Sequence, residues 1–135
     1  MEDSSNKIAV ELVTPDRLVY SNYAEMVVVP GSEGDFGVLY GHSPMISSIR
    51  MGIIDIHEDK SHIQRIFILG GFAEVTGDRC NILVEKAIDI DKMSREQAEQ
   101  NLKKAQDALA VSFKEEERPE LQKEVEVAQA LLQML

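Results

Sequence analysis

The sequence predicts a β-sandwich followed by a C-terminal antiparallel α-helical hairpin. Before about residue 90, short apolar runs alternate with polar residues and are broken by turn residues about every 8–12 positions, as in sandwiches and barrels. All eight glycines lie between Gly31 and Gly77. After residue 90 the apolar residues recur at spacings of three and four, which is the period of a helix. We therefore expect two parts, residues 1–89 and residues 90–135.

Period-two alternation is clearest where Ile8, Val10 and Leu12 face one side of the first strand. Two runs, residues 26–29 and 66–69, are apolar at every position, which indicates strands covered on both faces. The strands expected in the first part are Ile8–Thr14, Leu18–Tyr23, Glu25–Val29, Phe36–Leu39, Pro44–Arg50, Ile53–His57, Ile63–Leu69, Ala73–Thr76 and Cys80–Glu85.

Two helices are expected in the second part, joined by the polar run 114–118. Ser94 with Gln97 three residues later is typical of a helix N-cap. Pro119 suits the first turn of the second helix and would break one long helix. The expected seam residues are Ala98, Leu102, Ala105, Leu109 and Phe113 on the first helix, and Leu121, Val125, Ala128, Leu132 and Leu135 on the second.

Composition excludes several classes of protein. Fourteen basic against 24 acidic residues give a net charge of −10, which argues against nucleic acid and anionic membrane surfaces as partners. The single cysteine, Cys80, rules out an internal disulfide and lies on the same side of a strand as Ile82 and Val84. We interpret it as part of the core.

No catalytic constellation is evident in the sequence. His42 and Ser43 are neighbours, and in an extended strand they point to opposite faces, so neither can activate the other. There is no Gly-Lys-Ser/Thr phosphate loop and no Gly-x-Gly-x-x-Gly motif. We expect no catalytic residue, no metal site and no cofactor.

The segment from Asp55 to His62 contains residue types that bind metals. Asp55, His57 and His62 would be the ligands of a metal hydrolase. The favoured interpretation is a hairpin whose charged tip, Glu58 to Ser61, keeps it soluble.

The most unusual stretch is PGSEGDFGVLYGHSP, residues 30–44, in which four glycines encode several turns in succession. With the later GGFAEV, residues 70–75, it resembles the epsilon subunit of the bacterial F-type ATP synthase, whose mitochondrial counterpart is called delta. The resemblance covers essentially the whole chain.

The resemblance implies a sandwich of two five-stranded antiparallel sheets and a regulatory helical hairpin. It implies a non-catalytic rotor subunit of the central stalk, which binds the gamma subunit and the c ring and couples proton flow to ATP synthesis. The hairpin, when extended, would reach the alpha and beta subunits and restrain ATP hydrolysis. The implied location is the cytoplasmic face of the bacterial inner membrane, held there only through the complex.

The resemblance also assigns contact residues. The c-ring contact would be made by Ser32, Glu33, Gly34, Asp35 and Phe36. The gamma contact would be made by His42, Ser43, Pro44 and Met45. Carboxylates suit the basic and polar loop of a c subunit. Tyr40 stands where the family often has proline.

Some members of this family bind ATP at the start of the helical hairpin. Ile90 and Asp91 match the first half of their motif, and Ser94 and Arg95 stand at its arginine and alanine positions. The cation for phosphate is therefore absent or shifted by one residue, which implies weak or no nucleotide binding. Inhibitory members of the family place basic residues against an acidic loop of the beta subunit. The second helix here carries Glu120, Glu124 and Glu126 against Lys123, with Arg118 at its start.

A second hypothesis is a free-standing β-sandwich that binds a ligand and dimerises through its helical tail. The heptad-like seams allow such pairing between chains. The two hypotheses differ in the mass of the native particle, since a rotor subunit purifies with a much larger complex.

Overall fold

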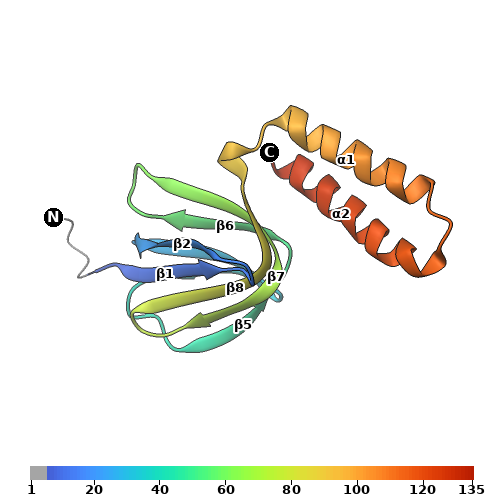
Figure 1. Cartoon of the computed structure of the whole chain (residues 1–135). Helices are drawn as coiled ribbons and strands as arrows, with labels where there is room; N and C mark the ends of the chain where they lie inside the picture. The colour runs from blue at the N-terminus through green and yellow to red at the C-terminus, as the bar shows by residue number, and fades with distance from the viewer. Residues whose placement is uncertain (1–5) are drawn as a thin grey trace. The chain divides into compact units, whose positions relative to one another are not determined.

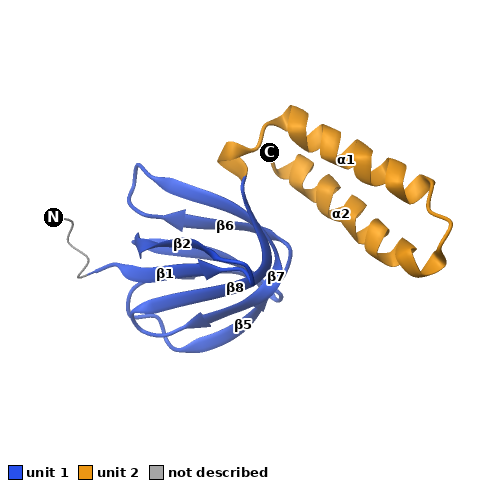
Figure 2. Cartoon of the chain, viewed as in Figure 1, with its two compact units in different colours: residues 1–89 blue, residues 90–135 orange. Residues whose placement is uncertain are grey.

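The computed structural model describes residues 6–135. The chain divides into two compact units, residues 1–89 and 90–135, which are treated one at a time (Figure 2). No helix among the described residues is both long and apolar enough to cross a membrane.

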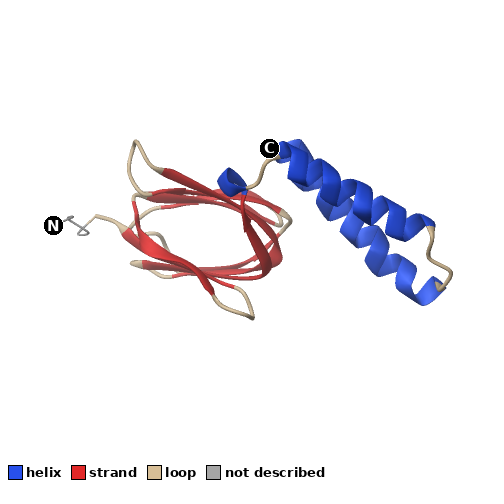
Figure 3. Ribbon diagram, turned by 45° about the horizontal axis from the view of Figure 1, so that its top comes forward, coloured by secondary structure: helices blue, strands red, loops and turns tan. Residues whose placement is uncertain are grey.

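Hydrogen bonds join the strands of the first unit into one continuous sheet that folds over on itself (Figure 1). One layer has the order β2-β1-β8-β7-β5 and the other the order β4-β3-β6-β7-β8, because β7 and β8 extend through both layers. Figure 3 shows the two layers of strands facing each other. The strands are β1 (Ile8–Val13), β2 (Leu18–Ala24), β3 (Met26–Gly31), β4 (Gly34–Val38), β5 (Met45–Ile49), β6 (Gly52–His57), β7 (Ile63–Val75) and β8 (Arg79–Asp89). The predicted sandwich of two five-stranded layers is confirmed.

Strand β7 corrects one detail of the prediction. Residues 63–69 and 73–76 were expected as separate strands, yet β7 runs without interruption from Ile63 to Val75. Its first half pairs with β6, and from Gly71 onward it pairs with β5. The Gly70-Gly71 pair therefore bends one strand between layers instead of ending it, a known use of glycine inside strands.

The direction of strand β1 also differs from the prediction. The sheets were expected to be antiparallel, but β1 and β8 are parallel neighbours, with Val10 opposite Cys80 and Leu12 opposite Ile82. Both strands begin at the same end of the sandwich, where Ala9 donates its N–H to the carbonyl of Asp78 (2.9 Å). No hairpin joins them, so no tight turn imposes an antiparallel direction.

The core lies between the layers and follows the predicted alternation. Ile8, Val10 and Leu12 are buried, and Cys80 lies among them on β8. Burial raises the pKa of the Cys80 thiol to about 12, because the thiolate would lose its hydration. The inward residues of β3, β6 and β7 close the core from the other layer, namely Val27, Val29, Ile54, Ile56, Ile66 and Ile68.

The second unit is a helical hairpin, as predicted. It has a short 3-10 turn η1 (Ile90–Lys92), helix α1 (Arg95–Ala110), a second turn η2 (Glu115–Glu117) and helix α2 (Arg118–Met134). Ser94 caps α1, its hydroxyl accepting the N–H of Gln97 at 3.0 Å. Pro119 lies in the first turn of α2.

The seam between the helices differs from the prediction at three positions. Ala98 and Val125 are buried as expected, but Leu131 is buried in addition, whereas Leu135 is exposed. Phe113, expected on the first seam, lies beyond the end of α1 and is 99% exposed. The first helix stops one turn earlier than its apolar pattern suggests, so Phe113 belongs to the connection.

Candidate functional site

The proposed c-ring segment folds as a tight hairpin between β3 and β4. Gly31 and Gly34 face each other across it, and Ser32 and Glu33 form its tip. A Cβ on Gly31 would lie 2.6 Å from the carbonyl oxygen of Gly34, and Gly34 has a φ of +135°. Both positions therefore require glycine, which explains part of the glycine pattern. Ser32 and Glu33 are exposed.

Residues 48–50 fix this hairpin from the side. The Ser32 N–H donates to the carbonyl of Ser48 (3.0 Å), and their hydroxyls are 2.8 Å apart. The Arg50 N–H donates to the carbonyl of Pro30 (3.0 Å). The Arg50 guanidinium also donates to the carbonyl of Gly31 and pairs with the Asp35 carboxylate. The tip is thereby held in one position although it is exposed.

The proposed gamma-contact segment is a loop between β4 and β5. Gly41 has a φ of +89° and donates its N–H to the carbonyl of Gly77 at 2.6 Å, which ties the loop to the β7–β8 turn. His42 donates its N–H to the carbonyl of Leu39 (3.0 Å) and its Nδ1–H to that of Ser43 (2.7 Å). Ser43 and Pro44 are exposed, whereas His42 and Met45 are half-buried.

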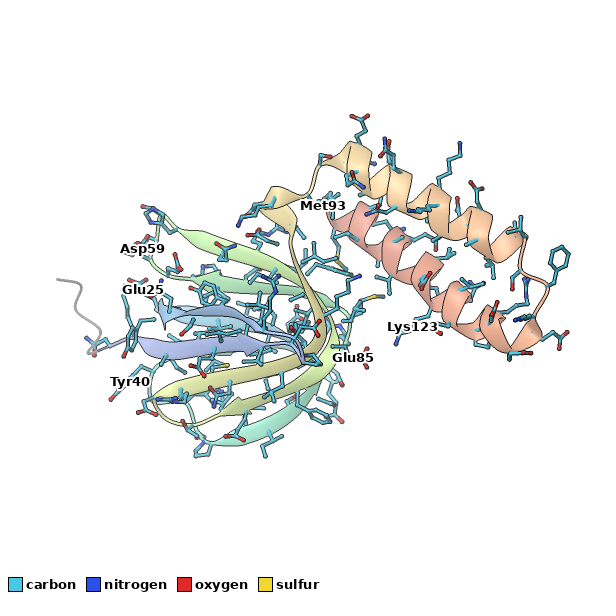
Figure 4. All side chains as sticks on the ribbon, in the orientation of Figure 1. Glu25, Tyr40, Asp59, Glu85, Met93 and Lys123 are labelled. Atoms are coloured by element: carbon cyan, nitrogen blue, oxygen red, sulfur yellow. The ribbon has the colours of Figure 1, made fainter. Side chains whose placement is uncertain are left out.

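Strand β5 connects the two segments. It begins at Met45, beside the loop, and ends at Ile49, which is paired with Gly31 at the base of the hairpin. The segments therefore lie at opposite ends of the sandwich, separated by the four residue steps of β5 from Met45 to Ile49, about 13 Å at roughly 3.3 Å per residue. In Figure 4, Tyr40 and Glu25 mark the end with the loop, and Glu85 marks the other.

The same layer carries an exposed apolar surface that the sequence reasoning missed. Cross-strand pairing places Leu18, Val13, Leu83 and Phe72 in a row over β2, β1, β8 and β7, and Ile46 on β5 lies diagonally beside Phe72. Leu18, Leu83 and Phe72 are 55%, 53% and 58% exposed, and Ile46 is 72% exposed. We call these five residues the outer apolar face.

A shallow hollow lies next to this row. It is open to solvent and lies between the β1–β2 turn and the bend of β7. The residues around it are Val13, Thr14, Pro15, Gly70, Gly71, Phe72, Leu83, Val84 and Glu85. A signal for the face exists in the sequence, because Phe72 shares the strand face of Glu74, and Leu83 shares that of Asn81 and Glu85. Contiguous exposed apolar surface of this kind marks a site for a partner.

The segment from Asp55 to His62 forms the expected hairpin. Asp55 pairs with Arg65 across the strands (3.4 Å), and Asp59 accepts the N–H groups of Ser61 and His62 (2.7 and 2.9 Å). These bonds, the backbone N–H of Ser61 first, hold the pKa of Asp59 below its ordinary value. Among residues 6–135, no three His, Cys, Asp or Glu side chains come together as a metal site.

The tip of this hairpin also contacts the edge strand β2. The Tyr20 hydroxyl donates to Glu58, and the Asn22 amide donates to the same oxygen at 3.1 Å. Burial, followed by the bond to Glu58, raises the pKa of Tyr20. This contact is structural, because it ties the edge of one layer to the other.

The residues of the degenerate nucleotide motif lie in η1 and at the start of α1. Ile90 is buried, Asp91 is exposed, and the Ser94 hydroxyl is occupied as the N-cap. Arg95, which directly follows the motif's arginine position at Ser94, forms an ion pair with Glu99 at 3.4 Å. The observed contacts are those of a helix start.

Comparisons with known proteins all point to one family. The sequence profile of the ATP synthase delta/epsilon chain β-sandwich domain matches residues 7–90. The ATP synthase epsilon chain of Rhodospirillum rubrum is 43% identical over 122 residues, covering 90% of this chain and 91% of that protein. That of Paramagnetospirillum magneticum is 47% identical over 105 residues, covering 78% and 79%.

The fold is also found in solved structures. A chain of the Euglena gracilis mitochondrial ATP synthase superposes with a TM-score of 0.76 at 22% identity, covering 95% of this chain and 81% of that one. A chain of the Tetrahymena thermophila mitochondrial ATP synthase central stalk and c ring gives 0.56 at 16% identity, covering 93% and 96%. The chain therefore belongs to the ATP synthase delta/epsilon family, and it is a non-catalytic subunit of that enzyme.

Proposed function

We propose that this chain is the central-stalk rotor subunit that binds the gamma subunit and the c ring, and so couples c-ring rotation to ATP synthesis. The family assignment supports the rotor role. The observation that carries the proposal is the outer apolar face, because a sandwich that worked alone would not expose Phe72, Leu83, Leu18 and Ile46 on one surface.

The gamma subunit would cover the outer apolar face together with the loop from His42 to Met45. The loop leads directly into β5, which carries Ile46, so the two are continuous. Burying large apolar side chains at the centre of an interface supplies most of its affinity. The half-buried His42 would lie at the edge of this contact.

The c ring would contact the hairpin tip from Ser32 to Phe36. This tip lies at the opposite end of β5 from the gamma-contact loop. The outer apolar face reaches it at Phe72, which is paired with Ser48, so the gamma and c-ring contacts would be neighbouring surfaces. A subunit held by both transmits torque without chemistry of its own. By this proposal the chain associates with the cytoplasmic face of the inner membrane only through the complex.

The helical hairpin would be a regulatory arm that reaches the alpha and beta subunits when extended. The second helix exposes Glu120, Glu124 and Glu126, which oppose binding to an acidic surface. We therefore propose only a small restraint on ATP hydrolysis.

Binding to an ATP synthase that lacks its epsilon chain, called here the epsilon-free enzyme, tests the proposal. Phe72→Ser and Leu83→Ser are each expected to weaken binding by about tenfold or more, as for central apolar anchors. Ile63→Ser is the matched control, since Ile63 is 45% exposed on the other layer. Equal affinity of all three variants and the unchanged chain would contradict the assignment of this face to gamma.

Two further variants test the loops. Gly34→Val introduces a side chain at a φ of +135°, and His42→Asp places a charge at the proposed interface. Each is expected to weaken binding to the epsilon-free enzyme, with circular dichroism showing a folded sandwich. Unchanged binding by both would show that these loops are not contact sites.

A further inference from the structure

Three charged side chains meet at the β3–β4 hairpin, and their arrangement is asymmetric. Glu33 lies at the exposed tip, Asp35 on β4 and Arg50 after β5. Arg50 pairs with Asp35, whereas Glu33 has no hydrogen-bond or ion-pair partner among residues 6–135. The Glu33 carboxylate is therefore free to bind a partner, whereas the Asp35 carboxylate, only two residues away, is already paired.

Arg50 also fastens the hairpin itself. Its backbone N–H donates to Pro30 (3.0 Å), and its guanidinium donates to Gly31 on one side and to Asp35 on the other. A guanidinium can bridge two acceptors in this way because its donors form a rigid planar fork, which a lysine lacks. One residue thus connects both strands of the hairpin just below its tip.

We propose that Arg50 is a positioning residue that orients the hairpin tip and occupies Asp35, so that Glu33 is the carboxylate presented to the basic loop of a c subunit. This inference rests on the proposed function and adds to it the residue that recognises charge. Asp35 belongs to the same segment, but its carboxylate is paired with Arg50 and so supports the hairpin.

The direction in which Arg50→Met changes the binding affinity distinguishes a positioning role from simple charge attraction. Replacing Arg50 with an uncharged residue leaves two carboxylates near the tip and no cation. If net charge alone decided binding to a basic loop, Arg50→Met would bind more tightly. If Arg50 positions the tip, Arg50→Met binds more weakly, and we expect a loss of about threefold, the size of a small exposed network.

Affinity of the full chain for the epsilon-free enzyme, immobilised with its c ring, is the measurement. Arg50→Lys keeps the charge but not the fork, and should recover only part of the loss. Tighter binding by Arg50→Met, or complete recovery by Arg50→Lys, would overturn the positioning role.

The carboxylates are compared by salt dependence. Glu33→Gln should weaken binding by about fivefold at about 50 mM NaCl and by less at about 300 mM, because salt screens an exposed charge. Asp35→Asn should change the salt dependence little, since its charge is already paired. Glu25→Gln is the matched control, because Glu25 is exposed at the other end of the sandwich (Figure 4).

The outcomes separate this inference from the proposed function. An unchanged chain that fails to bind the epsilon-free enzyme would contradict the proposed function itself. Binding by the unchanged chain with equal salt dependence for Glu33→Gln and Glu25→Gln would contradict only the role of Glu33. A larger loss for Asp35→Asn than for Glu33→Gln would reverse the assignment.

Discussion

A Cβ atom on Gly71 would lie 2.0 Å from the carbonyl oxygen of Leu83, so β7 and β8 approach each other more closely there than any side chain allows. The contact lies where β7 passes from one layer to the other. The Cα of Val84 would also be only 2.8 Å away. The second glycine of the GGFAEV segment is therefore required by packing, because both neighbours are backbone atoms that cannot rotate away.

Gly71→Ala is expected to lower the free energy of unfolding of the sandwich by about 2–4 kcal/mol, the cost of forcing backbone apart in a packed region. Urea unfolding followed by tyrosine fluorescence measures it, since all three tyrosines lie in the sandwich. Gly77→Ala is the control, because a Cβ there meets nothing within 4 Å. Equal urea midpoints for the two variants would contradict the close approach.

The buried thiol of Cys80 predicts a loss of stability at alkaline pH. Its pKa rises from 9.0 to about 12 on folding. Below about pH 9 both states keep the proton and the contribution is fully present. Above pH 9 the unfolded chain loses the proton while the folded chain retains it, so stability falls by up to about 1.4 kcal/mol per pH unit.

Cys80→Ala is expected to lose less stability than the unchanged chain between pH 9 and pH 11, measured as urea midpoints. Tyr20 also titrates late in the folded state, but it contributes equally to both proteins. Parallel pH profiles for the two proteins would show that the Cys80 thiol has no such effect.

The features of this structure that could be predicted are those that depend on residues close together in the sequence. The strand alternation around Ile8 and the cap at Ser94 depend on neighbours in sequence, and both are confirmed. The contact of Arg50 with Asp35 depends on the pairing of Gly31 with Ile49, which no local pattern encodes. The parallel pairing of β1 with β8 likewise joins segments about 70 residues apart, so sequence periodicity could not reveal it.

The exposed position of Phe113 predicts that it contributes nothing to the stability of the helical hairpin. Phe113→Ser should change the thermal midpoint of helix unfolding by less than the equivalent of about 0.5 kcal/mol. Val125→Ala removes two buried methyl groups and should cost about 1–2 kcal/mol. Circular dichroism at a helix wavelength compares them. A larger loss for Phe113→Ser would place it back in the seam.

ATP is expected to bind more weakly than ~1 mM, which corresponds to a free energy of only about 4 kcal/mol. The reason is that Ser94 is occupied as a helix cap and Arg95 is paired with Glu99. Calorimetric titration with magnesium and ATP measures this directly. Micromolar affinity would overturn the expectation and would show that Ile90 and Asp91 belong to a working site.

A chain that ends at Asp89 is expected to fold and to bind the epsilon-free enzyme as the full chain does. Among the residues that the structure describes, the buried sandwich core lies between Ile8 and Val84, so truncation removes none of it. The last pairing of β8, between Asp89 and Ile66, is retained, as is the hydrogen bond from Gln64 to Asp89 (2.8 Å). The outer apolar face and both contact loops are also complete.

The same truncation separates coupling from regulation. Proton-driven ATP synthesis should persist in the reconstituted complex, because torque would pass through the sandwich alone. The rate of ATP hydrolysis should rise only slightly, since the acidic second helix opposes a strong inhibitory contact. An Asp89-terminated chain that is unfolded, or that fails to join the complex, would show that the helical hairpin is part of the structural core. A large rise in hydrolysis would instead show that the hairpin restrains the enzyme through contacts other than its exposed charges.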